Sequence, residues 1–371
     1  MRLLDRYLLR ELAAPLIYCL SGFLIFWISS DLLSELDMFQ QEKLTVWDLG
    51  EYYLARLPEF LVLLLPIVLL LSLLYALTNH ARHQEITAMR AAGLGLWRVA
   101  LPYFLVALMC SLAVYALQEE LAPAGAERAQ RVRRRYVDTG PTREDFRWKL
   151  DLKFYNEREE RFWRIRAYNV ETGEMRDPYV EWRQEDGTRR QLLAEEARHV
   201  KGAWVFLRGR LFDPDPESTT PAVAFEEMRR PEFAETPAMI RSEYKVTQLD
   251  SIKAARKSQL TVSEILEYRW LHPRLSGRVE RLLETQLHRR LAAPWTCVVV
   301  VLIAIPFGAA SGRRNVFVGV ASSIFICFAY YVLQEFGAPL GAKGFVPPAV
   351  AAWLPNALFG LLGTVLTVRV R

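Results

Sequence analysis

The sequence predicts an α-helical membrane protein in which six transmembrane helices are divided three and three by an inserted β-rich domain. Hydrophobic residues make up 52% of the 371-residue chain and charged residues only 24%, which is too apolar for a soluble protein of this length. The uncharged residues also fall into windows without Asp, Glu, Lys or Arg, each close to the roughly 20 residues that an α-helix needs to cross a bilayer. The six windows are Leu12–Ser30, Phe60–Thr78, Val99–Gln118, Leu291–Gly312, Asn315–Gln334 and Gly344–Val368.

Neither a soluble helical core nor a signal peptide accounts for these windows. Buried helices of soluble proteins are usually shorter and rarely come in sixes. A removable signal peptide would be shorter than the first window and would end in a small-residue cleavage pattern, which is missing there. We therefore expect all six windows to remain as spans.

Lys and Arg in the short loops predict the orientation, because the side that is richer in them stays in the cytoplasm. Acidic residues dominate the loop predicted at 31–59, whereas the loops on the other side are basic. Both termini are therefore predicted to be cytoplasmic and the insertion extracytoplasmic. The arginines after the third window disagree, as the rule allows for long translocated domains. The basic residues assigned to the cytoplasm are Arg2, Arg6, Arg10, Arg82, Arg90, Arg98, Arg313, Arg314, Arg369 and Arg371.

The polar insertion, residues 119–290, has strand periodicity in its middle. From Trp148 to Phe154 apolar residues alternate with charged ones, which is the pattern of a half-buried β-strand. Further strands are predicted at 161–170, 179–182 and 203–212, with glycine-containing turns between them. Prolines between 214 and 237 then predict a looped or edge region rather than a central strand.

After about residue 258 the periodicity becomes helical. Thr261 and Glu264 have the spacing of a capping box, so a helix is predicted to begin there and to end at Pro273. A second amphipathic run from Val279 to Leu287 is predicted to lead into the fourth span. The resulting domains are 1–136 with the first three spans, 137–260 with the strands, and 261–371 with a helical connector and the last three spans.

Catalytic or metal-binding patterns are not found in the sequence. The five histidines are scattered, and the four cysteines, Cys19, Cys110, Cys297 and Cys327, all lie inside the windows, where packing is their expected role. A GxxxxGK[ST] nucleotide-binding loop is also missing. We therefore expect no enzyme, no metal site and no cofactor in this chain. If ATP drives the protein, a separate chain must hydrolyse it.

A short polar segment between the second and third windows is the most informative loop. Its residues 84–92 favour a helix, and Gly93 predicts where that helix ends. Periodicity leaves two interpretations open: the helix contacts another protein chain, or it lies on lipid with its arginines on the headgroups. The residues that share one helical face or flank it are Glu85, Ile86, Ala88, Met89 and Arg90.

The same segment, QEITAMRAAG at residues 84–93, resembles the cytoplasmic helix between the second and third spans of the lipopolysaccharide transport permeases, the LptF/LptG (YjgP/YjgQ) family. Four more segments resemble the family's pattern in the same order along the chain: LLDRYLLRE, AIPFGAASGRRN, YYVLQEFG and VPPAVAAWLPN. The LDRY opening is more similar to LptG than to LptF. The resemblance covers the whole chain and includes the arrangement of three helices, a β domain and three helices.

The resemblance implies a place in the bacterial inner membrane and a set of partners. An LptF-like permease would pair with this chain as a heterodimer, and a dimer of an LptB-like ATPase would bind ATP and magnesium beneath it. Lipopolysaccharide would pass through a periplasmic β-jellyroll to an LptC-like protein and a periplasmic bridge, and nucleic acid is not an implied partner. The family's coupling-helix positions correspond to Glu85, Ile86, Met89, Arg90 and Gly93.

A lipopolysaccharide site needs an apolar cavity for acyl chains and cations at its outer rim for phosphates. Aromatic residues of the first and fifth spans are the apolar candidates, with lipid contact or packing as the alternative for each. Acidic residues at the outer end of the first span, Asp31, Glu35 and Asp37, depart from such a site. The arginines after the third window are its candidate cations, or else a basic run on anionic lipid. The candidates are Phe23, Phe26, Trp27, Phe317, Phe325, Phe328, Arg131, Arg133, Arg134 and Arg135.

The predicted function is that of a permease subunit of an ABC transporter, which extracts lipopolysaccharide from the inner membrane and passes it to the periplasmic bridge. The alternative is a non-transporting receptor or assembly scaffold whose extracytoplasmic β domain binds a partner. Co-purification with an ATPase distinguishes the two classes, because only the transporter requires one.

Overall fold

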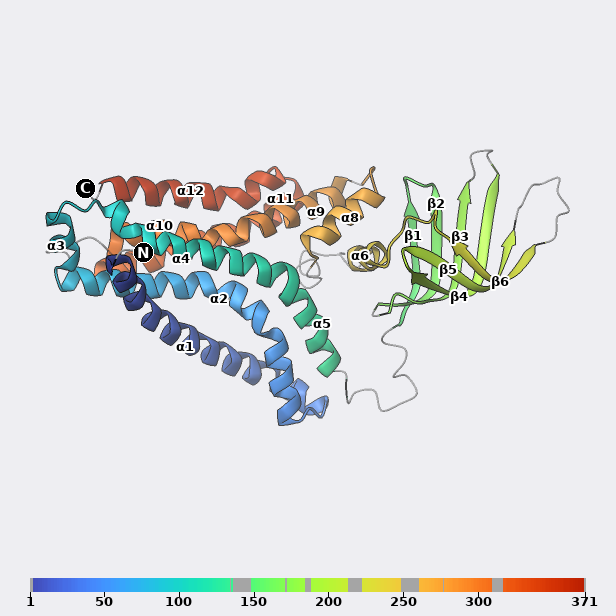
Figure 1. Ribbon diagram of the computed structural model, residues 1–371, viewed down its shortest axis with the longest axis horizontal. Helices are drawn as coiled ribbons and strands as arrows, with labels where there is room; N and C mark the ends of the chain where they lie inside the picture. The colour runs from blue at the N-terminus through green and yellow to red at the C-terminus, as the bar shows by residue number, and fades with distance from the viewer. Residues whose placement is uncertain are drawn as a thin grey trace. The chain divides into compact units, whose positions relative to one another are not determined.

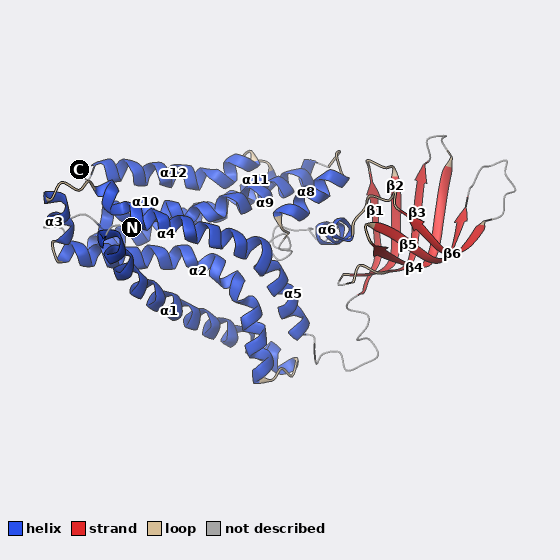
Figure 2. Cartoon of the chain, viewed as in Figure 1, coloured by secondary structure: helices blue, strands red, loops and turns tan. Residues whose placement is uncertain are grey.

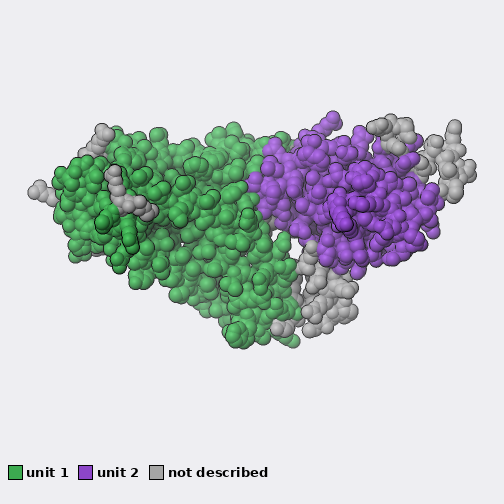
Figure 3. All heavy atoms as spheres, in the orientation of Figure 1, with its two compact units in different colours: residues 1–137, 277–371 green, residues 138–276 purple. Residues whose placement is uncertain are grey.

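The structure is a computed structural model that describes residues 3–133, 135, 148–170, 172–183, 188–212, 222–247, 260–275, 277–308 and 316–369. The chain forms two compact units, one of Met1–Val137 with Gly277–Arg371 and one of Asp138–Ser276 (Figure 3). The first unit is helical, and the second holds a β-sheet with two helices (Figure 2). Of the arginines used to predict the orientation, Arg2, Arg313, Arg314 and Arg371 lie outside the described residues.

Six helical stretches in the described ranges are long and apolar enough to cross a membrane, as predicted (Figure 1). Each of them overlaps one of the uncharged windows. The elements of this helical unit are α1 (Leu3–Gln41), α2 (Val46–Arg82), α3 (Glu85–Ala91), α4 (Leu96–Ala116), the π-helical turn η1 (Leu117–Leu121), α5 (Ala122–Arg133), α9 (Gly277–Ala292), the 3-10 turn η3 (Ala293–Trp295), α10 (Thr296–Gly308), α11 (Val316–Lys343) and α12 (Pro348–Arg369).

The loop predicted at 31–59 is helical except for a short turn. Helix α1 continues to Gln41, and α2 already begins at Val46. A capping box starts α2, because the Thr45 hydroxyl accepts a hydrogen bond from the Asp48 N–H while the Thr45 N–H donates to the Asp48 carboxylate. The prediction of a loop was wrong because charged residues can continue a helix beyond the hydrocarbon, and only the cap marks where it stops.

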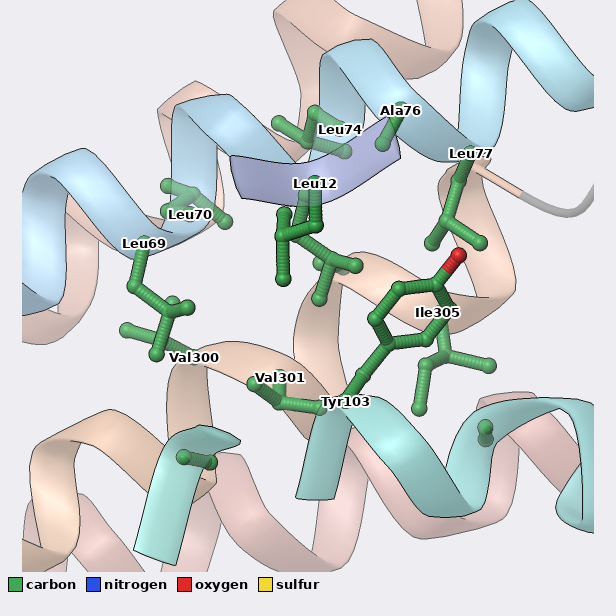
Figure 4. Packing of buried hydrophobic residues seen from close by; sticks show 14 of the residues in the cluster. Leu12, Leu69, Leu70, Leu74, Ala76, Leu77, Tyr103, Val300, Val301 and Ile305 are labelled. Carbon is green, nitrogen blue, oxygen red and sulfur yellow. The ribbon is translucent and has the colours of Figure 1, made fainter. Parts of the chain in front are cut away.

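Helix α10 lies in the core of the helical unit. Its residues 299–301 and 303–305 are buried, and it packs against α2, α4, α11 and α12. Figure 4 shows Leu12 of α1, Tyr103 of α4 and Ile305 of α10 meeting the leucines of α2. Cys297 and Cys327 are buried in the same cluster, in agreement with their predicted packing role. Helix α1 is different, because only 6% of its most apolar window is buried, compared with 61% for α2.

The fourth span is interrupted at η3, and neighbouring helices compensate for the break. Three of its backbone carbonyls accept side-chain hydrogen bonds: that of Arg290 from Gln118, that of Ala292 from Asn356, and that of Pro294 from Ser111. An interrupted helix is tolerated in hydrocarbon when neighbours satisfy its freed backbone groups in this way. The hydrogen bonds at this break therefore join the fourth span to the third and the sixth.

The second unit contains an antiparallel sheet whose strands follow one another in sequence order. All of the predicted strands are present, and two that were not predicted, β4 and β6, are added. This order is a simple meander, whereas the jellyroll implied by the resemblance is built of Greek keys. The strands are β1 (Trp148–Asn156), β2 (Arg161–Asn169), β3 (Met175–Arg183), β4 (Arg189–Val200), β5 (Ala203–Phe212) and β6 (Val223–Arg230).

Two details of the strands differ from the sequence pattern. Leu150 was assigned to the buried face of β1 but is 70% exposed, because the next residue, Asp151, has a left-handed φ of 52° that interrupts the alternation. Strand β4 was missed because it is rich in charge and buries mainly Leu192 and two alanines, which give a weak apolar signal. Strand β6 is at the edge of the sheet, as the prolines around it predict.

Two helices lie in the described part of the sheet unit, α6 (Pro237–Thr247) and α8 (Val262–Leu271). Pro237 is the first residue of α6 rather than part of a loop, because proline is favoured in the first turn of a helix, where its missing N–H costs nothing. The predicted capping box of Thr261 and Glu264 is confirmed at the start of α8. Pro214, Pro216 and Pro221 lie outside the described residues.

Candidate functional site

Apart from the aromatic candidates of α1 and α11, the predicted site residues that the structure describes lie at two opposite ends of the helical unit. Helix α3 is at one end, together with both termini of the chain, and we call this the α3 end (Figure 1). The turn between α1 and α2 and the end of α5 are at the other (Figure 1). We call the ion-paired residues there the rim, and they are Glu42, Asp48, Glu51, Arg128, Arg133 and Arg135.

Helix α3 is a single short helix with defined limits. It begins after Gln84, whose φ of 60° is left-handed and turns the chain sharply out of α2. Gly93 has a φ of +86°, and the N–H of Leu94 bonds back to the carbonyl of Met89. Gly93 therefore ends the helix as predicted, in a conformation that favours glycine.

The inward side of α3 contacts other helices of the same chain. Ile86 is 1% exposed and belongs to the core of the helical unit, against which Met89 also packs. The Glu85 carboxylate accepts hydrogen bonds from the Tyr7 hydroxyl, at 3.0 Å, and from the His80 Nδ1, at 2.7 Å. The first turn of α3 is therefore fixed to both α1 and α2.

The outward side of α3 consists of Thr87, Ala88, Arg90 and Ala91, all exposed. Arg90 was predicted to share a face with Ile86 and Met89, but the structure places those two inward and Arg90 outward. The outward side of α3 is thus a small surface with one cation. On the inward side, Ile86 and Met89 pack in the core. Displacing this surface would displace the core residues with it.

At the rim, the arginines proposed as phosphate ligands already bind carboxylates. Arg133 pairs with Glu42 at 2.8 Å, and Arg135 pairs with Asp48 at 2.6 Å and with Glu51 at 2.9 Å. Glu42 lies in the turn between α1 and α2, and Asp48 and Glu51 lie in α2, so the pairs join this part of the chain to the end of α5 and to Arg135 just beyond it. The acidic residues that argued against an anion site have other partners: Asp31 pairs with Arg56 at 3.1 Å, and Glu35 accepts a hydrogen bond from the Tyr52 hydroxyl. Arg134 lies outside the described residues.

Some of the aromatic candidates pack inside the protein, and the side chains of others are exposed. Phe23 and Trp27 pack on the cluster of α2, where the rings of Trp27 and Phe60 are 6.0 Å apart. Phe26 of α1 is 68% exposed, and Phe325 of α11 is 72% exposed. Phe317 belongs to α11, but its side chain lies outside the described part of the chain. Phe328 is 65% exposed, so Phe26, Phe325 and Phe328 are available to a ligand or a partner in the single chain.

Sequence reasoning did not identify the residues that fix the position of α3. Tyr7 and His80 bind Glu85, and Asp5 pairs with Arg98 at 2.9 Å. The partners are separated by up to 93 positions in the chain, so no local pattern connects them. Within the described ranges, no group of three or more His, Cys, Asp or Glu side chains is placed to hold a metal ion.

Comparison with known proteins decides the family. The sequence model of the lipopolysaccharide export system permease LptF/LptG matches residues 6–369. The chain belongs to the LptF/LptG family. A search of curated proteins found no match.

Membership of the LptF/LptG family establishes the function in outline. The chain is a permease of the lipopolysaccharide export system, a multi-pass membrane protein of an ABC transporter without a catalytic domain of its own. Its substrate is lipopolysaccharide, and its partners are those of the export system.

Proposed function

We propose that this chain is an LptG-like permease that pairs with an LptF-like permease and carries lipopolysaccharide out of the inner membrane. An LptB-like ATPase dimer beneath the pair supplies ATP hydrolysis with its magnesium, and this chain needs no cofactor itself. An LptC-like protein and a periplasmic bridge receive the lipid from the sheet unit. The LDRY opening favours LptG over LptF.

The observation that carries the proposal is the construction of α3. Its outward residues, including Ala88 and Arg90, form the docking surface for the ATPase, and Ile86 transmits its displacement into the core. A helix that only rested on lipid would be expected to point its apolar residues into the bilayer. Here the buried residue points into the protein instead.

The orientation of the chain follows from the same assignment. The α3 end faces the cytoplasm, which agrees with the basic residues Arg82, Arg90 and Arg98 beside it. The rim then faces the periplasm, at the height of lipid headgroups. The sheet unit, which the chain enters after α5 and leaves before α9, is periplasmic.

The exposed apolar side chains of α1 and α11 support pairing with a second permease. Phe26 and Phe325 are large and exposed, and α1 is the span with the smallest share of its window buried in this chain. Residues of this kind face lipid or a protein partner. In the proposed heterodimer they line the apolar space for acyl chains between the two permeases.

At the rim, substrate phosphates compete with carboxylates for the arginines, since both anions form charge-assisted bonds with a guanidinium. Glu42→Gln is expected to strengthen the response to lipopolysaccharide because Arg133 loses its competitor, whereas Arg133→Gln weakens it. The expected change is about tenfold in either direction, as for a hydrogen bond to a charged group. The measurement is the lipopolysaccharide concentration that gives half-maximal stimulation of ATP hydrolysis in the reconstituted complex. Changes in the same direction for both variants would mean that the ion pair is only structural.

The ATPase itself tests the proposed function against a receptor or scaffold. The chain, a related permease and a purified LptB-like ATPase are expressed together and isolated from membranes. A stable complex whose ATP hydrolysis responds to lipopolysaccharide supports the proposal. A chain that is stable alone and never retains the ATPase supports the scaffold.

A further inference from the structure

The beginning of α1 contacts the chain on both sides of α3, at Glu85 where α3 begins and at Arg98 where α4 begins. Before the segment, the Tyr7 hydroxyl donates to the two carboxylate oxygens of Glu85, at 3.0 and 3.2 Å. After it, the Arg98 guanidinium in the first turn of α4 pairs with Asp5, at 2.9 and 3.1 Å. Asp5 and Tyr7 are neighbours on α1, so one short piece of that helix is bound to both entry and exit of α3.

His80 strengthens the first of these contacts. Its side chain is 1% exposed, and its Nδ1 donates to the Glu85 carboxylate at 2.7 Å. The rings of Tyr7 and His80 also lie 5.7 Å apart. One carboxylate thus joins α1, α2 and α3, and charge-assisted hydrogen bonds of this kind are stronger than those between neutral groups.

Helix α1 has few fully buried residues. Its buried residues are Leu8 and Leu12, next to Tyr7, and Phe39 near its far end. The stretch between them has no buried residue, whereas α2 is buried along most of its length. In that stretch α1 packs on α2 through partly buried side chains such as Phe23 and Trp27, whereas at its beginning Tyr7 connects it to α3.

We propose that Tyr7 and Asp5 are positioning residues that make α1 move with α3, so that an ATPase stroke on α3 drives the first span as well as the second and third. This inference rests on the proposed function, in which α3 receives that stroke. Because α1 exposes Phe26 toward the space assigned to acyl chains, its displacement changes that space directly. The contacts of Asp5 and Tyr7 thereby couple ATP hydrolysis to movement of the lipid.

The proposal is tested in the full complex of this chain, a related permease and the ATPase in proteoliposomes containing lipopolysaccharide. The variants are Tyr7→Phe, Asp5→Asn and their combination, and the control is Tyr18→Phe, an exposed tyrosine of the same helix. Two quantities are measured: lipopolysaccharide released per ATP hydrolysed, and the nucleotide-dependent change in distance between fluorophores at Ser29 of α1 and Leu361 of α12. Both labelled positions are exposed.

The double variant is expected to bind the ATPase and hydrolyse ATP, but to release at least about fivefold less lipid per ATP, the lower end of typical coupling between sites. Its distance change is expected to shrink, while Tyr18→Phe behaves as the parent. Normal release and a normal distance change in the double variant would overturn the proposal. Equal loss of ATPase binding, hydrolysis and release would also overturn it, since the contacts would then only stabilise the fold. A parent complex that releases no lipid with ATP would instead contradict the proposed function.

Discussion

Ala88→Arg is expected to remove the ATPase from the complex. Ala88 lies in the middle of the outward side of α3 and is exposed, so the chain itself has room for a longer side chain. In a complex with a docked partner this room is lost. A new charged side chain in the centre of the interface separates the two surfaces and must also be desolvated. We expect affinity to fall by at least about 100-fold, which corresponds to roughly 2.7 kcal/mol.

The measurement is a binding titration of purified ATPase against the permease pair in nanodiscs. Gln41→Arg is the matched control, because it adds the same charge at an exposed helix end on the opposite side of the unit. Its affinity is expected to equal that of the parent. If Ala88→Arg bound the ATPase within twofold of the parent, α3 could not be the docking surface.

Glu235→Ala is expected to cause the largest loss of stability in the sheet unit. The Glu235 side chain is fully buried, and its carboxylate accepts bonds from Asn156, Arg161 and Trp163. Arg161 is only 5% exposed, so removal of the carboxylate leaves a buried charge without its counter-ion. Breaking a buried pair in this way costs about 3–5 kcal/mol.

Hydrogen exchange of the β2 amides in the full chain measures this cost. A loss of about 3–5 kcal/mol lowers protection of those amides by roughly 10²–10³-fold or more, if exchange follows opening of the whole unit. Glu195→Ala is the control, because the ion pair of Glu195 with Arg208 is largely exposed and such pairs contribute about 0–1 kcal/mol. Similar loss of protection in both variants would show that burial of Glu235 has no special effect.

The spans were predictable because hydrophobicity along a helix is local. Each uncharged window overlaps one helical stretch, and the capping box at Thr261 and the glycine stop at Gly93 are short-range signals of the same kind. The same logic identified the apolar alternation that begins β1. It failed at Leu150, where a single left-handed residue changed which face the side chain occupies.

The site was predictable only in part, because its geometry depends on distant residues. The sequence identified α3 and the rim arginines, but it could not show that Glu42 is the partner of Arg133 or that Tyr7 binds Glu85. The acids that argued against an anion site, Asp31, Glu35 and Asp37, are not the ones that pair with the rim arginines. Long-range pairs of this kind follow from helix packing, and no spacing along one helix encodes them.

A photo-crosslinker at Arg90 shows directly whether α3 meets the ATPase. Arg90 is on the outward side of α3, where the sequence alone left lipid and protein as equal alternatives. In the purified complex in nanodiscs, we predict that the crosslinker attaches to the ATPase, and that one at Gln41 does not. Crosslinks from Arg90 to lipid alone, with the ATPase bound to the complex, would contradict a docking role for α3.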